Sequence, residues 1–343
     1  MRVIRFLLNG VGQVGTRLLQ ILIQKQNLLR ERYHVELLLV GCADRGGAAW
    51  DPTGLPVERV LNLKRAGESV ARLPSVGRPQ VPAREMVAAA QADVLVEASP
   101  ANLETGEPGL GCIETALSRG MDVVTANKSP LALAFPRLQE LSSRFGGRIR
   151  FSATVGGGLP AVNLGQRDLA GTEIVRLEAI LNLTSHAILC WMEEGLPFEQ
   201  ALAQMQAAGH AEADPRLDVD GWDAAEKLVI LAWSVLRYPA TLADVSVRGI
   251  ADIGPERLSE ARATGCVIRP LALAERTPMG YRLAVGPTLL SQDHPLARLG
   301  PEQMGIVYYT DIGGVVAASI VEATPMPTAA AVLRDILDLY ASP

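Results

Sequence analysis

The first 150 residues carry short apolar runs separated by amphipathic segments. Residues 3–8 form a continuous apolar run that suits a buried strand, and residues 13–30 place Val14, Leu18 and Leu22 near one helical face. The same pattern predicts buried strands at residues 35–43, 94–98 and 122–125, and a helix at 109–119. Strands that alternate with helices in this way form one parallel sheet, so the pattern predicts an α/β, doubly wound domain over residues 1–150.

Downstream of residue 150 the periodicity becomes that of a mixed α+β domain. Helices are predicted at residues 198–208 and 328–340, and another begins at about Gly221 with Asp220 as its N-cap. Strands are predicted at residues 148–155, 173–181, 245–250, 264–274, 281–285, 305–310 and 314–321. We therefore expect a substrate-binding and dimerisation domain over residues 151–315 and a C-terminal segment, 316–343, that returns to the first domain.

Composition narrows the class of protein. The chain of 343 residues is 48% hydrophobic and 20% charged, which is typical of a globular protein. A net charge of −5 provides no basic surface for nucleic acid, and no apolar run has the length of a membrane span. The N-terminus lacks the layout of a signal peptide, and the four cysteines are widely spaced, so we expect free thiols in the cytoplasm.

Glycines follow the first predicted strand directly and open the first predicted helix. Their spacing is that of a dinucleotide-binding turn, in which glycine permits a tight bend and a close approach of the backbone to a pyrophosphate. The helix N-terminus behind the turn favours an anion because its N–H groups have no partner in the helix. We therefore expect a Rossmann-type domain that binds NAD or NADP. The expected cofactor contacts are Gly10, Val11, Gly12, Gln13, Val14 and Gly15.

Further polar residues stand where predicted strands end. Asp44 would accept hydrogen bonds from an adenosine ribose and favour NAD, whereas the adjacent Arg45 could hold the 2′-phosphate of NADP. The sequence leaves both cofactors open, and an acid that merely opens a turn is the competing interpretation of Asp44. Ser99 and Lys128 follow later strands, at the edge where doubly wound sheets bind ligands; a solvated loop lysine is the competing interpretation of Lys128.

Carboxylates gather around one lysine in residues 209–227. Asp223 and Lys227 stand four residues apart on a predicted helix and therefore share a face. Glu212 and Asp218 precede them on a turn-rich stretch that can fold back toward the same place. Such a cluster suits a small zwitterionic ligand with a proton to exchange. An ordinary surface ion pair, worth about 0.3 kcal/mol, is the competing interpretation.

Taken together over nearly the whole chain, these motifs resemble the homoserine dehydrogenase family. The resemblance rests on the glycine turn, on Val124-Thr-Ala-Asn-Lys128-Ser-Pro-Leu131 and on Thr154-Val-Gly-Gly-Gly158-Leu-Pro160. It continues through Ile180-Leu-Asn182-x-Thr184 and residues 209–227, and it ends with Pro327-Thr-Ala-Ala-Ala-Val-Leu-Arg-Asp-Ile336. Many dehydrogenases share the glycine turn, whereas the combination of Asn127-Lys128 with residues 209–227 is specific.

The resemblance implies reversible, NAD(P)-dependent interconversion of L-homoserine and L-aspartate 4-semialdehyde by a cytoplasmic homodimer. This reaction is a step in threonine and methionine biosynthesis. The resemblance also implies that Lys227 donates the proton, that Asp223 orients it, and that Lys128 is a second active-site lysine. The implied substrate contacts are Glu212, Asp218, Asp223 and Thr184, with a backbone contact to cofactor or substrate from Gly209.

One departure from the family pattern concerns a metal ion. The resemblance implies a monovalent-cation site at the carbonyls of Val155, Gly157 and Leu159. Ser152 stands where many members have an acid that completes this site, so we expect weak cation binding at most.

Other departures bear on function. Leu183 and His186 replace the usual glycine and asparagine, so a dehydrogenase of another amino-acid alcohol or aldehyde is one alternative. A non-catalytic NAD(P)-sensing protein is a second alternative, against which Lys128, Asp223 and Lys227 speak because a sensor needs no proton donor. The chain stops at position 343, so we expect no additional regulatory domain.

Overall fold

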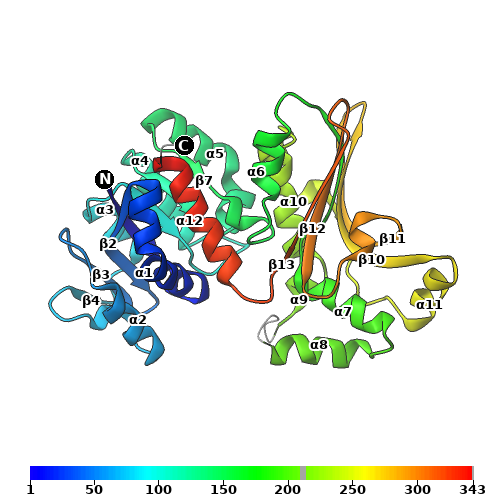
Figure 1. The fold of residues 1–343 in the computed structure, drawn as a ribbon, viewed down its shortest axis with the longest axis horizontal. Helices are drawn as coiled ribbons and strands as arrows, with labels where there is room; N and C mark the ends of the chain where they lie inside the picture. Colours follow the sequence, from blue (N-terminus) through cyan, green and yellow to red (C-terminus); the bar gives the residue numbers. More distant parts are fainter. Residues whose placement is uncertain (209–213, 342–343) are drawn as a thin grey trace. The chain divides into compact units, whose positions relative to one another are not determined.

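The computed structural model describes residues 1–208 and 214–341 and divides the chain into two compact units (Figure 1). Unit 1 comprises Met1–Gly158 together with Thr324–Pro343, and unit 2 comprises Leu159–Ala323. The sequence pattern placed the corresponding divisions at about residues 150 and 315. Among the described residues, no helix combines the length and the apolar character needed to cross a bilayer.

Unit 1 is built on a mostly parallel sheet. Its strands are β1 (Arg2–Asn9), β2 (Val35–Asp44), β3 (Gly47–Trp50), β4 (Gly77–Pro79), β5 (Val94–Glu97), β6 (Asp122–Thr125) and β7 (Ile149–Arg150). Within the described residues they form one seven-stranded sheet in the order β4-β3-β2-β1-β5-β6-β7. The five strands from β2 to β7 in this order are parallel, and β3 and β4 add an antiparallel edge that the sequence pattern did not predict.

The strand order places a ligand crevice at a defined edge. β1 lies between β2 and β5. The chain first adds β2, β3 and β4 on one side of β1 and then adds β5, β6 and β7 on the other side. In an open α/β sheet this switch point opens a crevice at the carboxyl ends of the strands. The carboxyl ends of β1, β5 and β6 lie side by side, because Asn9 pairs with Glu97 and Glu97 pairs with Thr125.

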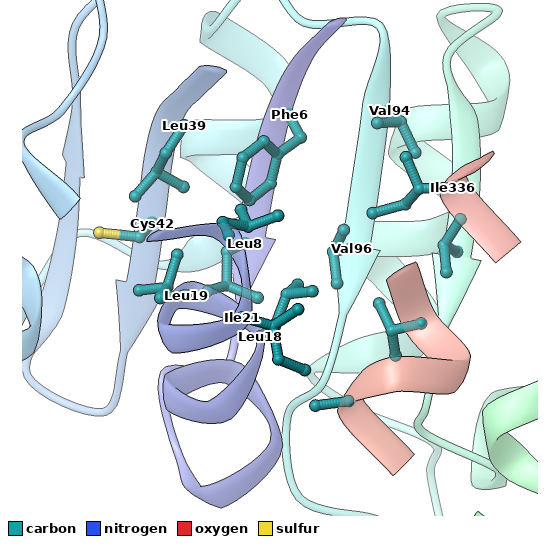
Figure 2. Close-up of a cluster of buried hydrophobic side chains, with 14 of the residues drawn as sticks. Phe6, Leu8, Leu18, Leu19, Ile21, Leu39, Cys42, Val94, Val96 and Ile336 are labelled. Atoms are coloured by element: carbon teal, nitrogen blue, oxygen red, sulfur yellow. The ribbon is translucent and has the colours of Figure 1, made fainter. Parts of the chain in front are cut away.

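Helices cover unit 1 and bury its apolar residues. They are α1 (Gln13–Tyr33), α2 (Val57–Arg65), α3 (Ala83–Ala89), α4 (Gly109–Ser118), α5 (Ser129–Phe145) and α12 (Met326–Tyr340). Figure 2 shows Leu18 and Leu19 of α1 packed on Phe6 and Leu8 of β1, with Ile336 of α12 in the same cluster. Full burial of each such side chain contributes roughly 1.5–3 kcal/mol, which holds the C-terminal helix against residues more than 300 positions earlier.

The strand predicted over residues 148–155 is much shorter in the structure. β7 ends at Arg150, and a 3₁₀ turn, η2 (Ser152–Thr154), follows it. The backbone N–H of Ser152 donates to the carboxylate of Asp335 on α12 at 2.8 Å, and its hydroxyl donates to the same group at 2.6 Å. A side chain from the distant C-terminus therefore takes the backbone donor that a neighbouring strand would have used.

Unit 2 combines an antiparallel-rich sheet with helices. Its strands are β8 (Ile174–Ile180), β9 (Val245–Val247), β10 (Cys266–Thr277), β11 (Gly280–Ser291), β12 (Gln303–Thr310) and β13 (Val315–Val321). In the described residues the order is β13-β12-β8-β10-β11-β9, with only the β11–β9 pair parallel. Its helices are α6 (Ala161–Asn163), α7 (Leu183–Glu193), α8 (Phe198–Ala207), α9 (Arg216–Val219), α10 (Trp222–Ser234) and α11 (Pro255–Ala263).

The predicted N-cap of α10 is wrong by one residue. Gly221 occupies the N-cap position with φ +91°, and Asp220 ends α9 instead. The chain turns from α9 into α10 through a left-handed conformation that glycine adopts without a steric penalty. Residues 228–232 of α10 are fully buried, so the helix is anchored by its apolar middle and needs no side-chain cap.

Candidate active site

The glycine turn of unit 1 is shaped by close backbone contacts. Gly10 has φ +96°, and a Cβ atom there would lie 2.3 Å from the carbonyl of Ala98, beyond the end of β5. A Cβ atom on Gly15 would lie 2.2 Å from the carbonyl oxygen of Gly10. Only glycine therefore fits at these positions, because the turn packs against its own helix and against the neighbouring strand end.

Gly12 differs from its two neighbours in the motif. A Cβ atom at this position would meet nothing within 4 Å, so the space beside it is open. Gly12 is also the N-cap of α1, and in the described chain no side chain caps this end and no acid lies in its first turn. The open space beside uncapped N–H groups fits the pyrophosphate of a dinucleotide.

The other predicted cofactor contacts in the glycine turn, Val11, Gln13 and Val14, differ in their burial. Val11 is buried and Val14 packs partly buried against the core, whereas Gln13 is exposed. The side chains of the two valines thus position the turn, and their backbone groups are what remains for a ligand.

Asp44 is bound by groups of its own unit. One carboxylate oxygen accepts hydrogen bonds from the hydroxyl of Ser69 at 2.6 Å and from the N–H of Gly46 at 3.0 Å. The other accepts from Lys64 Nζ at 2.6 Å and from the N–H of Val70 at 3.0 Å. Burial alone would raise the pKa of Asp44, but the bonds from Lys64 and Ser69 outweigh it and lower this pKa below its ordinary value.

The internal hydrogen bonds of Asp44 bear on how an adenosine ribose could bind beside it. Its carboxylate already accepts four donors, which leaves little capacity for ribose hydroxyls. Arg45 is exposed beside it. The ammonium group of Lys64 forms an ion pair with the Asp44 carboxylate. Arg45 is therefore the exposed cation that a 2′-phosphate would meet at this position.

Ser99 and Lys128 both lie at the carboxyl edge of the sheet in unit 1. Ser99 is buried just beyond β5, and Asn127 Nδ2 donates to its hydroxyl at 3.3 Å. Lys128 is partly exposed at the N-cap position of α5. The Asn127 side chain accepts from the N–H of Ser129 at 3.3 Å, so it fixes the turn that presents Lys128.

Lys227 and Asp223 of unit 2 form the ion pair that their spacing predicts. Lys227 Nζ lies 2.6 Å from Asp223 Oδ2 on α10, and both side chains are mostly buried. Nζ also donates at 2.6 Å to the carbonyl of Leu181, just beyond β8. An ammonium group has three donors, and in the described part of the chain the third has no partner.

Asn182 joins the two predicted acids and was not given a role by the sequence. Its Nδ2 donates to Asp218 at 2.6 Å and to Asp223 at 2.7 Å, while its Oδ1 accepts from the N–H of Ser185 and caps α7. An asparagine ahead of an apolar helical segment is an N-cap signal, but the sequence does not show that its amide also reaches two acids. Thr184 completes the cluster with a hydrogen bond to Asp218.

The cluster is electrostatically unbalanced. Burial raises the pKa of Asp218, and the nearby carboxylate of Asp223 raises it further, although Asn182 and Lys227 oppose the shift in part. In the described residues of the cluster, two carboxylates therefore face one ammonium group. A second cation entering the cluster would relieve this repulsion, which is the property expected of a site for an amino-acid ammonium group.

Three residues that the sequence pattern singled out do not belong to the observed cluster. Gly209 and Glu212 lie outside the described residues. His186 is fully buried, and its Nε2 lies 3.0 Å from the carbonyl oxygen of Gly300. Burial lowers the pKa of His186 to about 4, and the charge of Arg269 contributes, so the ring is neutral at physiological pH. These are the properties of a hydrogen-bonded structural histidine.

The expected cation site has no support from acidic side chains. Ser152 directs its hydroxyl to Asp335, and no group of three or more potential metal-binding side chains occurs among the described residues. Val155 and Gly157 belong to unit 1, and Leu159 is the first residue of unit 2. A cation bound by their carbonyls stays a prediction.

The fold and site of unit 1 are those of a dinucleotide-dependent dehydrogenase, and comparisons with known proteins specify the family. The NAD-binding domain of homoserine dehydrogenase matches residues 10–152, and the homoserine dehydrogenase domain matches residues 160–337. The chain is 37% identical to homoserine dehydrogenase from Methanocaldococcus jannaschii over 97% of both chains. It is 33% identical to NAD(+)-dependent homoserine dehydrogenase from Pseudomonas canavaninivorans over 97% of this chain and 95% of that one.

Solved structures agree with the sequence relatives. Homoserine dehydrogenase from Thermoplasma acidophilum superposes with a TM-score of 0.82 at 26% identity, covering 98% of this chain and 99% of that one. A hyperthermophilic archaeal homoserine dehydrogenase in complex with NADPH gives a TM-score of 0.84 at 26% identity, covering 98% and 97%. The chain belongs to the homoserine dehydrogenase family, and it is an NAD(P)-dependent oxidoreductase.

Proposed function

We propose a division of labour between the two units in the interconversion of L-homoserine and L-aspartate 4-semialdehyde. Unit 1 binds NAD or NADP through the glycine turn, and unit 2 binds the amino-acid substrate at the cluster of Asn182, Asp218, Asp223 and Lys227. The observation that carries this proposal is the pairing of Lys227 with both Asp223 and the Leu181 carbonyl. It fixes an ammonium group in place with one donor left for a substrate oxygen.

Lys227 is the proposed proton donor when the aldehyde is reduced. The bound nicotinamide supplies the hydride that the aldehyde carbon accepts. Negative charge then develops on the aldehyde oxygen, and Lys227 transfers a proton to it, which yields the alcohol. In the reverse direction neutral Lys227 accepts the hydroxyl proton. Asp223 pairs with Lys227 and holds its Nζ in one orientation.

The acidic side of the cluster is the proposed binding site for the substrate α-ammonium group. Asp218 lies in a buried environment next to Asp223, and a bound ammonium group compensates both charges. Thr184 and Asn182 hold Asp218 in position. We expect Glu212 to join this contact and Gly209 to contact the cofactor or the substrate through its backbone.

Lys128 is the proposed contribution of unit 1 to the reaction. It begins α5 at the same sheet edge as Ser99 and the glycine turn. A cation at this edge attracts the substrate carboxylate or the developing oxyanion. We propose that Lys128 is a second active-site lysine and that Ser99 lies against the cofactor.

We also propose that the protein is a homodimer of the cytoplasm. Val315 and Val321 are 61% and 55% exposed on β13, an edge strand of the sheet in unit 2, and Leu289 on β11 is 56% exposed. An exposed apolar edge strand pairs readily with another chain, and a second copy would cover it. Cys42, Cys112, Cys190 and Cys266 are free thiols, which fits a reducing compartment.

An absorbance assay tests the proposed function. Purified protein is incubated with L-homoserine and either NAD or NADP, and reduction of the nicotinamide is followed. Turnover with L-homoserine, and none with other amino-acid alcohols, is the expected result. Turnover of a different alcohol in preference to homoserine would overturn the substrate assignment. Cofactor binding without any turnover would identify a sensor.

A further inference from the structure

Glu97 is a fully buried acid at the carboxyl end of β5, inside the sheet edge where we propose that the cofactor binds. One carboxylate oxygen accepts from Asn9 Nδ2 at 2.6 Å. The other accepts from the backbone N–H of Ser99 at 2.8 Å and from its hydroxyl. Burial of an ionisable group at this depth is costly, so it needs a structural or functional reason.

The position of Glu97 links the ends of three strands. Asn9, Glu97 and Thr125 form one row across β1, β5 and β6. Asn9 immediately precedes the glycine turn. Asn127 follows β6, donates to the Ser99 hydroxyl at 3.3 Å and also hydrogen-bonds with Glu97. One carboxyl group thus connects the glycine turn, the Ser99 loop and the turn before Lys128.

Helix α4 packs closely against the hydrogen bonds of Glu97. A Cβ atom on Gly109, the first residue of α4, would lie 2.6 Å from Asn127 Nδ2 and 3.4 Å from the Glu97 carboxyl carbon. Gly109 therefore lets α4 approach the network closely. Asn9 Nδ2 also lies 3.5 Å from the sulfur of Cys112 on the same helix. The hydrogen bonds are consequently confined to one geometry.

We propose that Glu97 is a positioning residue for cofactor binding, which sets the glycine turn, Ser99 and the turn before Lys128 in register with one another. Its carboxylate has two oxygens that accept several donors at once, and no neutral side chain of this size offers that capacity. An amide in its place would present a donor to Asn9 Nδ2 unless Asn9 turned over. This inference rests on the proposed placement of NAD(P) at this edge of unit 1.

The test compares Glu97→Gln with Asp122→Asn. Asp122 is a buried acid at the opposite, amino-terminal end of the neighbouring strand β6, where it binds Arg148. Binding of NADH and of NADPH is titrated by nicotinamide fluorescence without substrate, and thermal unfolding is recorded for each variant. We expect Glu97→Gln to raise the Kd of both cofactors about tenfold or more, and Asp122→Asn to leave both unchanged even if its Tm falls.

The outcomes separate the possible failures. A folded Glu97→Gln variant with wild-type Kd values would overturn the inference, as would an equal rise in Kd for Asp122→Asn. If Glu97→Gln does not fold, Asn9→Ala decides, because it removes a side-chain donor to the carboxylate and the Asn9 side chain has no proposed contact with the cofactor; an unchanged Kd there would overturn the inference. Wild-type protein that binds neither cofactor would instead overturn the proposed function. Non-additive effects of Glu97→Gln and Asn9→Ala on Kd would show that the two act through one network.

Discussion

Lys227 Nζ lies 2.6 Å from Asp223 Oδ2, one helical turn away on α10. The pair is mostly buried, with 14% and 13% of the two side chains exposed. An exposed pair at this spacing contributes little to stability, whereas a buried pair also holds the ammonium group in one direction. The proposed proton transfer by Lys227 relies on this fixed direction.

Substitution of Lys227 should reduce turnover without affecting cofactor binding. We expect Lys227→Ala to lower kcat by about 10²–10⁴-fold because the developing oxyanion loses its proton donor. The Kd for NADPH should stay at its wild-type value. Lys25→Ala, which removes an exposed lysine of α1, is the matched control and should behave as wild type. An unchanged kcat in Lys227→Ala would remove this residue from the mechanism.

Asp218 should show opposite effects on stability and on substrate affinity. Its folded-state pKa is raised above the ordinary value of 3.8, so the native state binds a proton more readily than the unfolded state. Its contribution to stability is therefore present at low pH and is lost as the pH rises through the folded-state pKa. At pH 7 we expect Asp218→Asn to increase the free energy of unfolding by about 0.5–1 kcal/mol and to raise the KM for homoserine about tenfold or more.

The pH dependence provides the check on this prediction. The stability advantage of Asp218→Asn over wild type should shrink as the pH falls through the folded-state pKa of Asp218, and it should vanish below 3.8. Urea unfolding measured across this range reports the difference. A variant that is less stable than wild type at pH 7 with an unchanged KM would contradict both parts.

Two substitutions within one motif should fail in different ways. Gly12→Ala places a methyl group in open space, so the Tm should stay unchanged, while the Kd for NAD(P)H should rise about tenfold because the pyrophosphate needs that space. Gly10→Ala places it 2.3 Å from the Ala98 carbonyl at φ +96°, which should cost roughly 3 kcal/mol or more of stability. Calorimetry and fluorescence titration measure the two effects. An equal loss of Tm in both variants would contradict the prediction that Gly12→Ala affects cofactor binding and Gly10→Ala affects stability.

Arg45 should discriminate between the two cofactors. Because Asp44 is occupied by four internal donors, we expect Arg45→Ala to weaken NADP binding about tenfold and NAD binding little. Arg59→Ala, an exposed arginine of α2, is the control. A parallel loss of affinity for both cofactors would show that Arg45 does not contact the 2′-phosphate.

The proposed homodimer can be tested at β13. We expect Val315→Lys combined with Val321→Lys to convert a dimer into monomers, since two charges would then line the exposed edge strand. Met279→Lys is the control, because Met279 is 91% exposed in unit 2 outside the strands. Analytical ultracentrifugation measures the mass. A monomeric wild type, or a double variant that stays dimeric, would rule out this interface.

Local pattern determined a large part of this protein. β1, β2, β5, β6, α1 and α4 of the first half follow from apolar runs and from glycine spacing, because short-range sterics and hydrophobic periodicity act within a few residues. The Lys227–Asp223 pair follows in the same way from its i, i+4 spacing on one helix. The family motifs, which lie in both halves of the chain, predicted the reaction.

Only the tertiary structure decided the contacts that join distant segments. Asp335 accepts the hydrogen bonds of Ser152 beyond the end of β7, Asn182 bridges Asp218 and Asp223, and four donors bind Asp44. Nothing in the local sequence fixes these partners, because each hydrogen bond depends on how elements far apart in the chain pack together. The sequence therefore determined which chemical groups the protein carries and which face of each element they share. Packing decided which of those groups are already satisfied and which remain for a ligand.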